Sequence, residues 1–247
     1  MSKGRIRLDK LLVDKGLADS RQRASALIRA GSVLVNDMVR DKPGTQVQSD
    51  SSVRLRDNPL PYVGRGGLKL EAALDAFSID PTDMTAADLG ASTGGFTDCL
   101  LQRGAKKVYA IDVGYGQLAW KLRQDDRVVV MERTNARHLE SLPEPIDLIV
   151  GDLSFISLTK ILPAICRLGS PGTQAVLLIK PQFEVGREAV GKGGVVRDDE
   201  ARQAAIDSIQ EAAKAAGAEC HGVIDSPVPG AKKGNIEALL HLTLGAP

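Results

Sequence analysis

The chain has 247 residues, of which 43% are apolar and only 3% are aromatic, so its cores must consist mainly of aliphatic side chains. This length is enough for one full-sized domain and a small one, and the net charge of +1 by itself excludes no partner. The three cysteines are too few and too widely spaced for a disulfide framework or a zinc site, and no apolar run has the length of a signal peptide or a membrane span. We therefore expect a cytoplasmic protein that does not enter a membrane.

Charge is distributed unevenly along the chain. Residues 1–57 carry twelve Lys and Arg side chains and seven Asp side chains, a net charge of +5, whereas the rest of the chain is mildly acidic. We call residues 1–57 the head and the rest of the chain the body. A basic segment joined to an acidic one is typical of a polyanion-binding module attached to another domain.

The N-terminal segment has the pattern of helices followed by short strands. Ser20 is placed to cap a helix over Arg21–Arg29, which ends at Ala30-Gly31. Short strands are predicted over Ser32–Asn36, at Val39 and near Val53–Leu55.

Two prolines within three residues, in Asn58-Pro59-Leu60-Pro61, interrupt regular structure. We place a domain boundary there, with a small α+β domain over residues 1–57, a linker over 58–63 and a second domain over 64–247.

The second segment alternates strands with helices, and its clearest helix runs over Asp198–Ala216. Seven strands are predicted, near Ala86–Leu89, Lys107–Asp112, Arg127–Met131, Ile146–Gly151, Ala175–Lys180, Gly222–Asp225 and Glu237–Leu244. This alternation predicts an α/β fold, a Rossmann-like sheet of about seven strands with helices on both faces. Ligands then bind beyond the carboxyl ends of the strands, and the glycine-rich residues 181–197 should form a mobile loop beside that site.

A glycine-rich segment, Asp88-Leu89-Gly90-Ala91-Ser92-Thr93-Gly94-Gly95-Phe96, ends the first of these strands and opens a helix. Its glycines permit a tight turn and close approach to a ligand. Asp112 ends the next strand, where a carboxylate can accept both ribose hydroxyls of an adenosine cofactor. NAD-binding turns and structural turns also use glycine, but Asp88 would repel a pyrophosphate and suits the ammonium group of S-adenosylmethionine. We expect Asp88, Gly90, Ser92, Gly94, Gly95, Phe96 and Asp112 to bind this cofactor.

Four charged residues lie at or beside the expected strand ends or on the first helix of the body: Lys69, Asp152, Lys180 and Glu237. If the last strand is antiparallel, its start shares an edge with the ends of the others, and the four side chains converge. A ribose 2′-hydroxyl needs help to attack a methyl group. A lysine can take the proton of the 2′-hydroxyl only while the lysine is neutral. Burial and a second nearby cation both favour this neutral form, because they lower the pKa of the lysine. Asp152 and Glu237 would orient the two ammonium groups, and the cations would stabilise a developing alkoxide. Ordinary surface ion pairs are the alternative interpretation.

Residues 64–244 resemble the FtsJ-like family of RNA ribose methyltransferases, whose catalytic set is Lys-Asp-Lys-Glu in this chain order. Residues 7–56 resemble an S4-type RNA-binding domain, in Arg7-Leu8-Asp9-Lys10, Ser20-Arg21-Gln22-Arg23-Ala24 and Ala30-Gly31-Ser32-Val33. Together with Gly64–Leu70 and Asp88–Phe96, they closely resemble the TlyA (hemolysin A) family.

That resemblance implies 2′-O-methylation of cytidine in 16S or 23S ribosomal RNA, with Lys69, Asp152, Lys180 and Glu237 catalytic. It also implies Gly94, Phe96, Asp112, Asp152 and Asn135 as cofactor-binding residues. The short ends of the chain leave the ribosomal subunit open. Expected partners are ribosomal RNA or ribosomal subunits, with the protein a monomer.

Other functions fit less well. Amino-group methyltransferases usually carry a proline-containing motif where this chain has Asp152-Leu153-Ser154-Phe155, and no cysteine nucleophile lies near that place. A pseudouridine synthase often shares the head domain, but the body is of the wrong class. A pore-forming hemolysin needs membrane-spanning segments that we do not find. An RNA-binding protein with an inactive body is expected to have lost part of the four-residue set.

Clustered basic side chains in the head, joined by one at the start of the body, are expected to bind RNA: Arg5, Arg7, Lys10, Arg21, Arg23, Arg29 and Arg65. The histidines, His138, His221 and His241, show no metal-ligand spacing, and we expect no metal. Tyr115 and Trp120 are expected to pack inside the protein.

Overall fold

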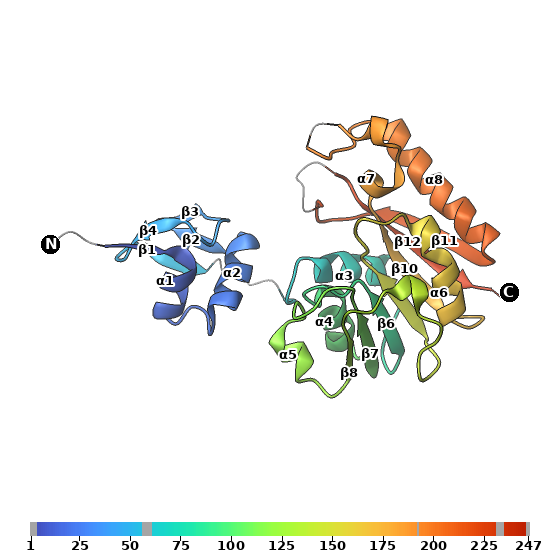
Figure 1. Cartoon of the computed structure of the whole chain (residues 1–247), viewed down its shortest axis with the longest axis horizontal. Coiled ribbons are helices and arrows are strands. Elements are labelled where there is room, and N and C mark those ends of the chain that lie inside the picture. The colour runs from blue at the N-terminus through green and yellow to red at the C-terminus, as the bar shows by residue number, and fades with distance from the viewer. Residues whose placement is uncertain (1–3, 56–60, 192, 231–234, 246–247) are drawn as a thin grey trace. The chain divides into compact units, whose positions relative to one another are not determined.

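The computed structural model describes residues 4–55, 61–191, 193–230 and 235–245. The chain divides into two compact units, Met1–Arg65 and Gly66–Pro247, which Figure 1 shows in blue and in teal to red. Of the predicted linker, 58–63, residues 58–60 lie outside the described residues.

The N-terminal unit contains two short helices and short antiparallel strands. In chain order its described elements are β1 (Arg5–Arg7), α1 (Leu8–Asp14), α2 (Arg21–Arg29), β2 (Val33–Val35), β3 (Met38–Val39), β4 (Gln46–Gln48) and β5 (Val53–Leu55). β1 pairs with β4, and β2 lies between β3 and β5.

Local sequence explains most of this unit. The Ser20 side chain accepts a hydrogen bond from Arg23 N at the start of α2, as an N-cap does. Asn36 and Asp37 both have positive φ angles, which suit the tight turn between β2 and β3. Leucines of α1 pack with Ile28 and Val33 in one buried cluster. The sequence pattern did not predict β1 and β4, because three-residue strands carry little periodic signal.

The C-terminal unit is an α/β domain. Its described helices and strands are α3 (Gly66–Ala76), β6 (Thr85–Leu89), α4 (Gly95–Gln102), β7 (Lys107–Ile111), α5 (Trp120–Arg123), β8 (Val128–Met131), β9 (Leu148–Gly151), α6 (Leu162–Leu168), β10 (Gln174–Ile179), α7 (Pro181–Glu184), α8 (Asp199–Ala215), β11 (Ala218–Asp225) and β12 (Ala238–Leu244). Three short 3₁₀ helices are η1 (Ala136–His138), η2 (Leu158–Lys160) and η3 (Arg187–Ala189).

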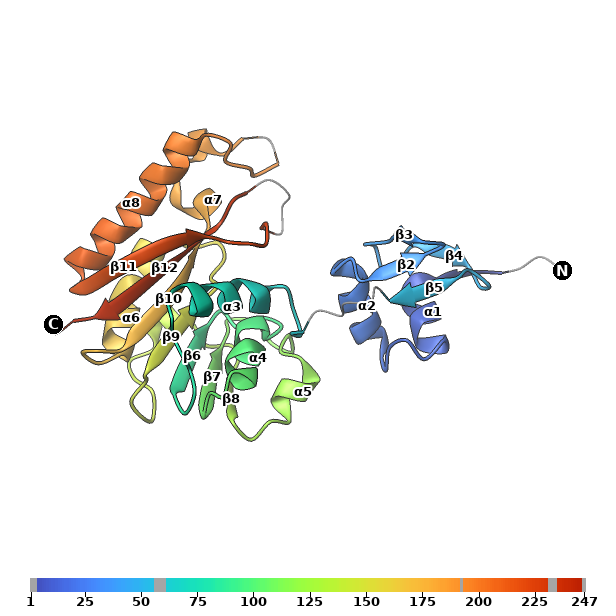
Figure 2. The same ribbon diagram turned by 180° about the vertical axis from the view of Figure 1, so that it is seen from behind.

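Seven strands form one sheet in the order β11-β12-β10-β9-β6-β7-β8. β12 is antiparallel to both of its neighbours, and β8, β7, β6, β9 and β10 are mutually parallel. α6 and α8 cover one face of the sheet, and α3 and α4 cover the other (Figures 1 and 2). The predicted Rossmann-like fold is confirmed, and the last strand runs antiparallel, which is the condition on which the four charged residues were expected to converge.

Two expectations need correction. β11 begins at Ala218 rather than near Gly222, because a bulge between Cys220 and Gly222 interrupts its alternation. Residues 181–197, which we expected to be a loop, contain α7 and η3 in their described part, and Val195 and Val196 are buried. Asn235 holds the end of this segment, since its side chain accepts from Val196 N and donates to Gly194 O.

Candidate active site

The strand order brings the ends of β6 and β9 together. β6 lies between β9 and β7, so the chain changes direction across the sheet at this point. Asp152 N, just past β9, donates a hydrogen bond to Leu89 O at the end of β6. Open α/β sheets bind ligands at such a switch point. The candidate site is therefore the carboxyl edge around β6 and β9.

Lys180 follows β10 directly and is only 8% exposed. Its Nζ lies 2.5 Å from Asp152 Oδ1 and donates to Ser154 Oγ at 2.8 Å. A buried ammonium needs such partners, because removal of a charge from water is costly. The β9 and β10 segments thus supply one ion pair at the carboxyl edge.

Glu237 and Lys69 form the second ion pair. Glu237 precedes β12 and is 2% exposed, and Lys69 lies in the first turn of α3. Their Nζ and Oε2 atoms are 2.5 Å apart. Both groups are buried and have lost their contact with water, so the charge of each compensates the other for that loss.

The register of β10 and β12 makes the two ion pairs neighbours. Ile179 lies opposite Ala238, so Lys180 and Glu237 occupy adjacent positions just beyond this pair of residues. The antiparallel direction of β12 is necessary for this placement, because a parallel strand would start at the opposite edge. The structure therefore gathers all four predicted catalytic residues at one edge, each lysine paired with a carboxylate.

Glycines let α3 and α4 start close together. A Cβ on Gly95 would lie 3.0 Å from Gly67 N, which is closer than side chains normally approach backbone. A Cβ on Gly66 would lie 3.5 Å from the buried Phe96 ring and 3.9 Å from Asp152 Oδ2. The start of α3, which carries Lys69 in its first turn, therefore lies beside the turn that follows β6.

Asp88 is the second-last residue of β6 and is fully buried. Its Oδ2 accepts hydrogen bonds from Thr97 N and Thr97 Oγ1, at 3.0 and 2.6 Å. Its Oδ1 is buried and has no hydrogen-bond partner among the described residues. Burial, helped by the nearby charges of Asp152 and Asp112 and opposed by the bonds from Thr97, raises the pKa of Asp88 to about 7. An unsatisfied buried carboxylate oxygen favours a cationic or hydrogen-donating ligand.

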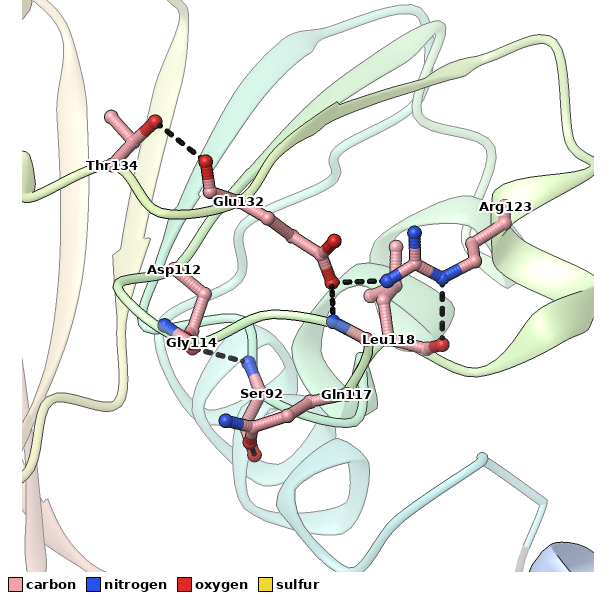
Figure 3. A network of polar contacts seen from close by, with 9 residues as sticks. Ser92, Asp112, Gly114, Gln117, Leu118, Arg123, Glu132 and Thr134 are labelled. Carbon is pink, nitrogen blue, oxygen red and sulfur yellow. Dashed lines mark hydrogen bonds and ion pairs between the residues drawn. The ribbon is translucent and has the colours of Figure 1, made fainter.

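Asp112 follows β7 and contacts the glycine-rich turn. Its Oδ2 accepts from Ser92 N at 2.8 Å and its Oδ1 from Gly114 N at 2.6 Å (Figure 3). The carboxylate is partly exposed, so it has room for further donors. Ser92 itself has a positive φ angle of 49°, which marks a sharp turn at this place.

A second carboxylate stabilises the loop between β7 and α5. Glu132 accepts from Gly116 N at 2.7 Å and pairs with Arg123, which also donates to Leu118 O (Figure 3). The pKa of Glu132 is lowered: burial opposes ionisation, and the bonds from Arg123 and the backbone outweigh it. This network holds the loop next to Asp112.

The other predicted cofactor residues have mainly structural contacts. Gly90 and Gly94 have positive φ angles, and side chains there would collide with Asp152 O and with the Leu118 and Leu122 side chains, respectively. Asn135 caps η1 by accepting from Arg137 N and remains exposed. Close packing of protein segments thus explains the glycines at least as well as close approach of a ligand.

All seven side chains predicted to bind RNA belong to exposed residues, which are Arg5, Arg7, Lys10, Arg21, Arg23, Arg29 and Arg65. Two of them also have a structural contact, since Arg7 and Arg21 pair with the buried Asp9. The bonds from Arg7, and then those from Arg21, lower the pKa of Asp9 to about 2 despite its burial.

Tyr115 and Trp120 do not pack inside the protein, contrary to expectation. They are 69% and 73% exposed, and the Arg133 guanidinium lies 4.3 Å from the centre of the Tyr115 ring. Phe155, after β9, is 91% exposed. The prediction was wrong because apolar character alone does not distinguish a core aromatic from a surface one in a loop.

Sequence reasoning missed Ser154 and Thr97, which contact Lys180 and Asp88. Ser154 has a usable signal, because it is a hydroxyl residue two positions after a strand-end carboxylate. Within the described ranges, we find no group of three or more metal-ligating side chains and no helix long and apolar enough to span a bilayer.

Comparison with known families gives two matches. Residues 62–243 match the family described as FtsJ-like methyltransferase, and residues 6–53 match the S4 domain.

Individual proteins extend these matches. The chain is 48% identical to the 16S/23S rRNA (cytidine-2′-O)-methyltransferase TlyA of Mycobacterium tuberculosis, over 96% of this chain and 90% of that protein. A solved structure from Streptococcus thermophilus, described as a hemolysin, has a TM-score of 0.78 and 43% identity, covering 100% of this chain and 91% of that one. An S-adenosylmethionine dependent methyltransferase from Listeria monocytogenes, only 18% identical, shares the fold with a TM-score of 0.54 over 72% and 98% of the two chains.

Proposed function

Because the chain belongs to the FtsJ-like methyltransferase family and also contains an S4 domain, we propose that it methylates the 2′-hydroxyl of a cytidine in ribosomal RNA with S-adenosylmethionine. The observation that carries this proposal is the two adjacent ion pairs, the buried Lys69 with Glu237 and the buried Lys180 with the partly exposed Asp152. The rRNA methyltransferase of M. tuberculosis, 48% identical, supports the choice of substrate.

The cofactor site is proposed at the ends of β6 and β7. Asp88 offers its unsatisfied oxygen to the ammonium group, Asp112 accepts the ribose hydroxyls, and Asp152 borders the methyl-bearing end. The remaining residues assigned to this site are Gly90, Ser92, Gly94, Gly95, Phe96 and Asn135. Bound S-adenosylmethionine supplies an electrophilic methyl group.

Lys180 is proposed to take the proton of the 2′-hydroxyl as the oxygen attacks. Asp152 and Ser154 orient its amine, because Ser154 Oγ accepts from Nζ and Asp152 Oδ1 forms an ion pair with it. Lys69, oriented by Glu237, adds positive charge where the oxygen becomes negative. Burial of Lys69, Glu237 and Lys180 strengthens these interactions.

The N-terminal domain, proposed as residues 1–57 with a linker over 58–63 before the body at 64–247, is assigned to RNA binding. Its exposed basic residues contact phosphates, and Arg65 extends this set. Ribosomal RNA or a ribosomal subunit is the expected partner, so we expect the protein to act in the cytoplasm.

Ribose methylation mapped across 16S and 23S rRNA, in ribosomes from cells with and without the gene, tests this function. One cytidine or a few should lose methylation without the gene, and purified protein should restore it in vitro. Methylation that is unchanged at every ribose would contradict the proposal.

A further inference from the structure

The segments that follow β9 and β10 contact each other at successive points. Near the strands, Lys180 pairs with Asp152 and donates to Ser154. One turn further on, the Phe155 and Phe183 rings lie 5.3 Å apart. Beyond them, Glu184 bonds to the start of η2. The candidate catalytic lysine is thus at one end of a series of contacts, and Glu184 is at the other.

Glu184 caps η2 with both carboxylate oxygens. Oε2 accepts from Ser157 Oγ at 2.6 Å, and Oε1 accepts from Leu158 N at 3.0 Å. Leu158 N is at the start of a helical turn, where backbone N–H groups lack helical partners. Burial raises the pKa of Glu184, and the Ser157 and Leu158 bonds oppose that rise. The carboxylate therefore holds this turn from a half-buried position.

In the loop between Asp152 and Ser157, Leu153 packs partly buried against the main core cluster. Ser154 and Phe155 are exposed, and Phe155 has a positive φ angle of 64°. Burial of side chains therefore does not hold Ser154 and Phe155 in place. One end is anchored by the bond from Asp152 N to Leu89 O, and the other by Glu184.

We propose that Glu184 is a positioning residue for Lys180: by anchoring the turn at Ser157 and Leu158, it keeps Ser154 against the lysine ammonium. This inference rests on the proposed methyltransferase function. Glu184 contacts neither the reacting oxygen nor the cofactor in this scheme, and it acts through the loop alone.

The test compares Glu184→Ala with Glu184→Gln. Misplacement of a catalytic group can cost on the order of a hundredfold in rate, so Glu184→Ala should lower kcat by about ten- to a hundredfold. S-adenosylmethionine affinity should change by less than about threefold, because Asp152 has its own anchor at Leu89 O and the other cofactor residues lie on other loops. Glu184→Gln should recover most of the rate, since the amide can accept from Leu158 N and donate to Ser157 Oγ. Glu211→Ala, on the exposed face of α8, is the matched control.

Ser157→Ala provides an independent arm. It removes one of the two bonds, and combined with Glu184→Ala it should add little further loss, because both changes break one contact. Full additivity would overturn the inference, as would a normal kcat in Glu184→Ala. Melting curves identify any variant that fails to fold, and Glu184→Gln then decides the question.

A structural measurement separates this inference from the proposed function. In the wild-type protein Ser154 Oγ lies 2.8 Å from Lys180 Nζ. In crystals of Glu184→Ala this distance should be too long for a hydrogen bond. An unchanged distance refutes the positioning role, whatever the activity. Absence of methyl transfer by the wild-type protein on every rRNA would refute the function and leave the geometric result standing.

Discussion

Lys69 and Glu237 are 168 positions apart in the chain, yet their side chains form a buried ion pair at 2.5 Å. The pair joins the first helix of the C-terminal unit to its last strand. Loss of one member leaves the other charge buried and unpaired, whereas loss of both leaves neither.

We therefore expect Glu237→Ala to destabilise the C-terminal unit by about 3–5 kcal/mol. The double variant Lys69→Met with Glu237→Leu should regain most of that stability and remain inactive, because the charges serve the reaction. Urea unfolding and methyl-transfer assays measure the two effects. Recovery of activity in the apolar double variant would remove both residues from the proposed mechanism.

Lys180→Ala should remove nearly all turnover, by at least about a hundredfold, while S-adenosylmethionine binding stays near normal. Lys180→Arg should fail equally, because a guanidinium keeps its charge but cannot give up a proton at working pH. Single-turnover assays make the comparison, with Lys160→Arg, at an exposed position, as control. Substantial turnover by Lys180→Arg would make Lys180 a charge stabiliser only.

Asp112→Ala should weaken S-adenosylmethionine affinity ten- to hundredfold, which corresponds to roughly 1.5–3 kcal/mol for charge-assisted hydrogen bonds. The fold should survive, because the residue lies past the end of β7 and its partners are loop N–H groups. Calorimetric titration measures the change, and Asp207→Ala on the exposed face of α8 should have no effect. Equal affinities for wild type and Asp112→Ala would argue against an adenosine site.

Asp88 predicts a pH dependence of cofactor binding. Its folded-state pKa is raised to about 7, so the buried carboxyl favours the neutral form, and this contribution to stability is lost as pH rises through 7. A cationic ligand favours the ionised form. Affinity for S-adenosylmethionine should therefore increase as pH rises through about 7 and then level off, with protons released on binding below that pH.

Calorimetry in buffers of different ionisation enthalpy detects the released protons. Asp88→Asn should bind more weakly and without this dependence. A wild-type affinity that is flat between about pH 6 and 8 would show that Asp88 does not face the cofactor's charge.

The C-terminal body alone, residues 58–247, should bind S-adenosylmethionine but methylate RNA poorly, because the basic head has been removed. RNA binding by the full chain should weaken steeply with salt, since each phosphate contact releases counterions. Filter binding over a salt series and methylation by the truncated body test this division. Full activity of the truncated body at physiological salt would contradict it.

Local pattern in the sequence determined much of the architecture. Apolar runs ending in Asp88, Asp112, Asp152 and Lys180 predicted strands and placed these side chains at strand ends, where the structure has them. The helix predicted over Asp198–Ala216 is α8, with Asp198 as its cap. Such features depend on neighbours within a few residues, so composition and spacing suffice to find them.

Only the tertiary structure decided which charges pair. Lys69 meets Glu237, and Lys180 meets Asp152, because β12 runs antiparallel beside β10 and α3 packs on α4 through glycines. The same long-range packing leaves Trp120 exposed, buries Asp88 with one free oxygen, and links Glu184 to Ser157. Ion pairing and burial depend on which distant segments of the chain meet at the same edge of the sheet. Local sequence patterns do not predict such contacts.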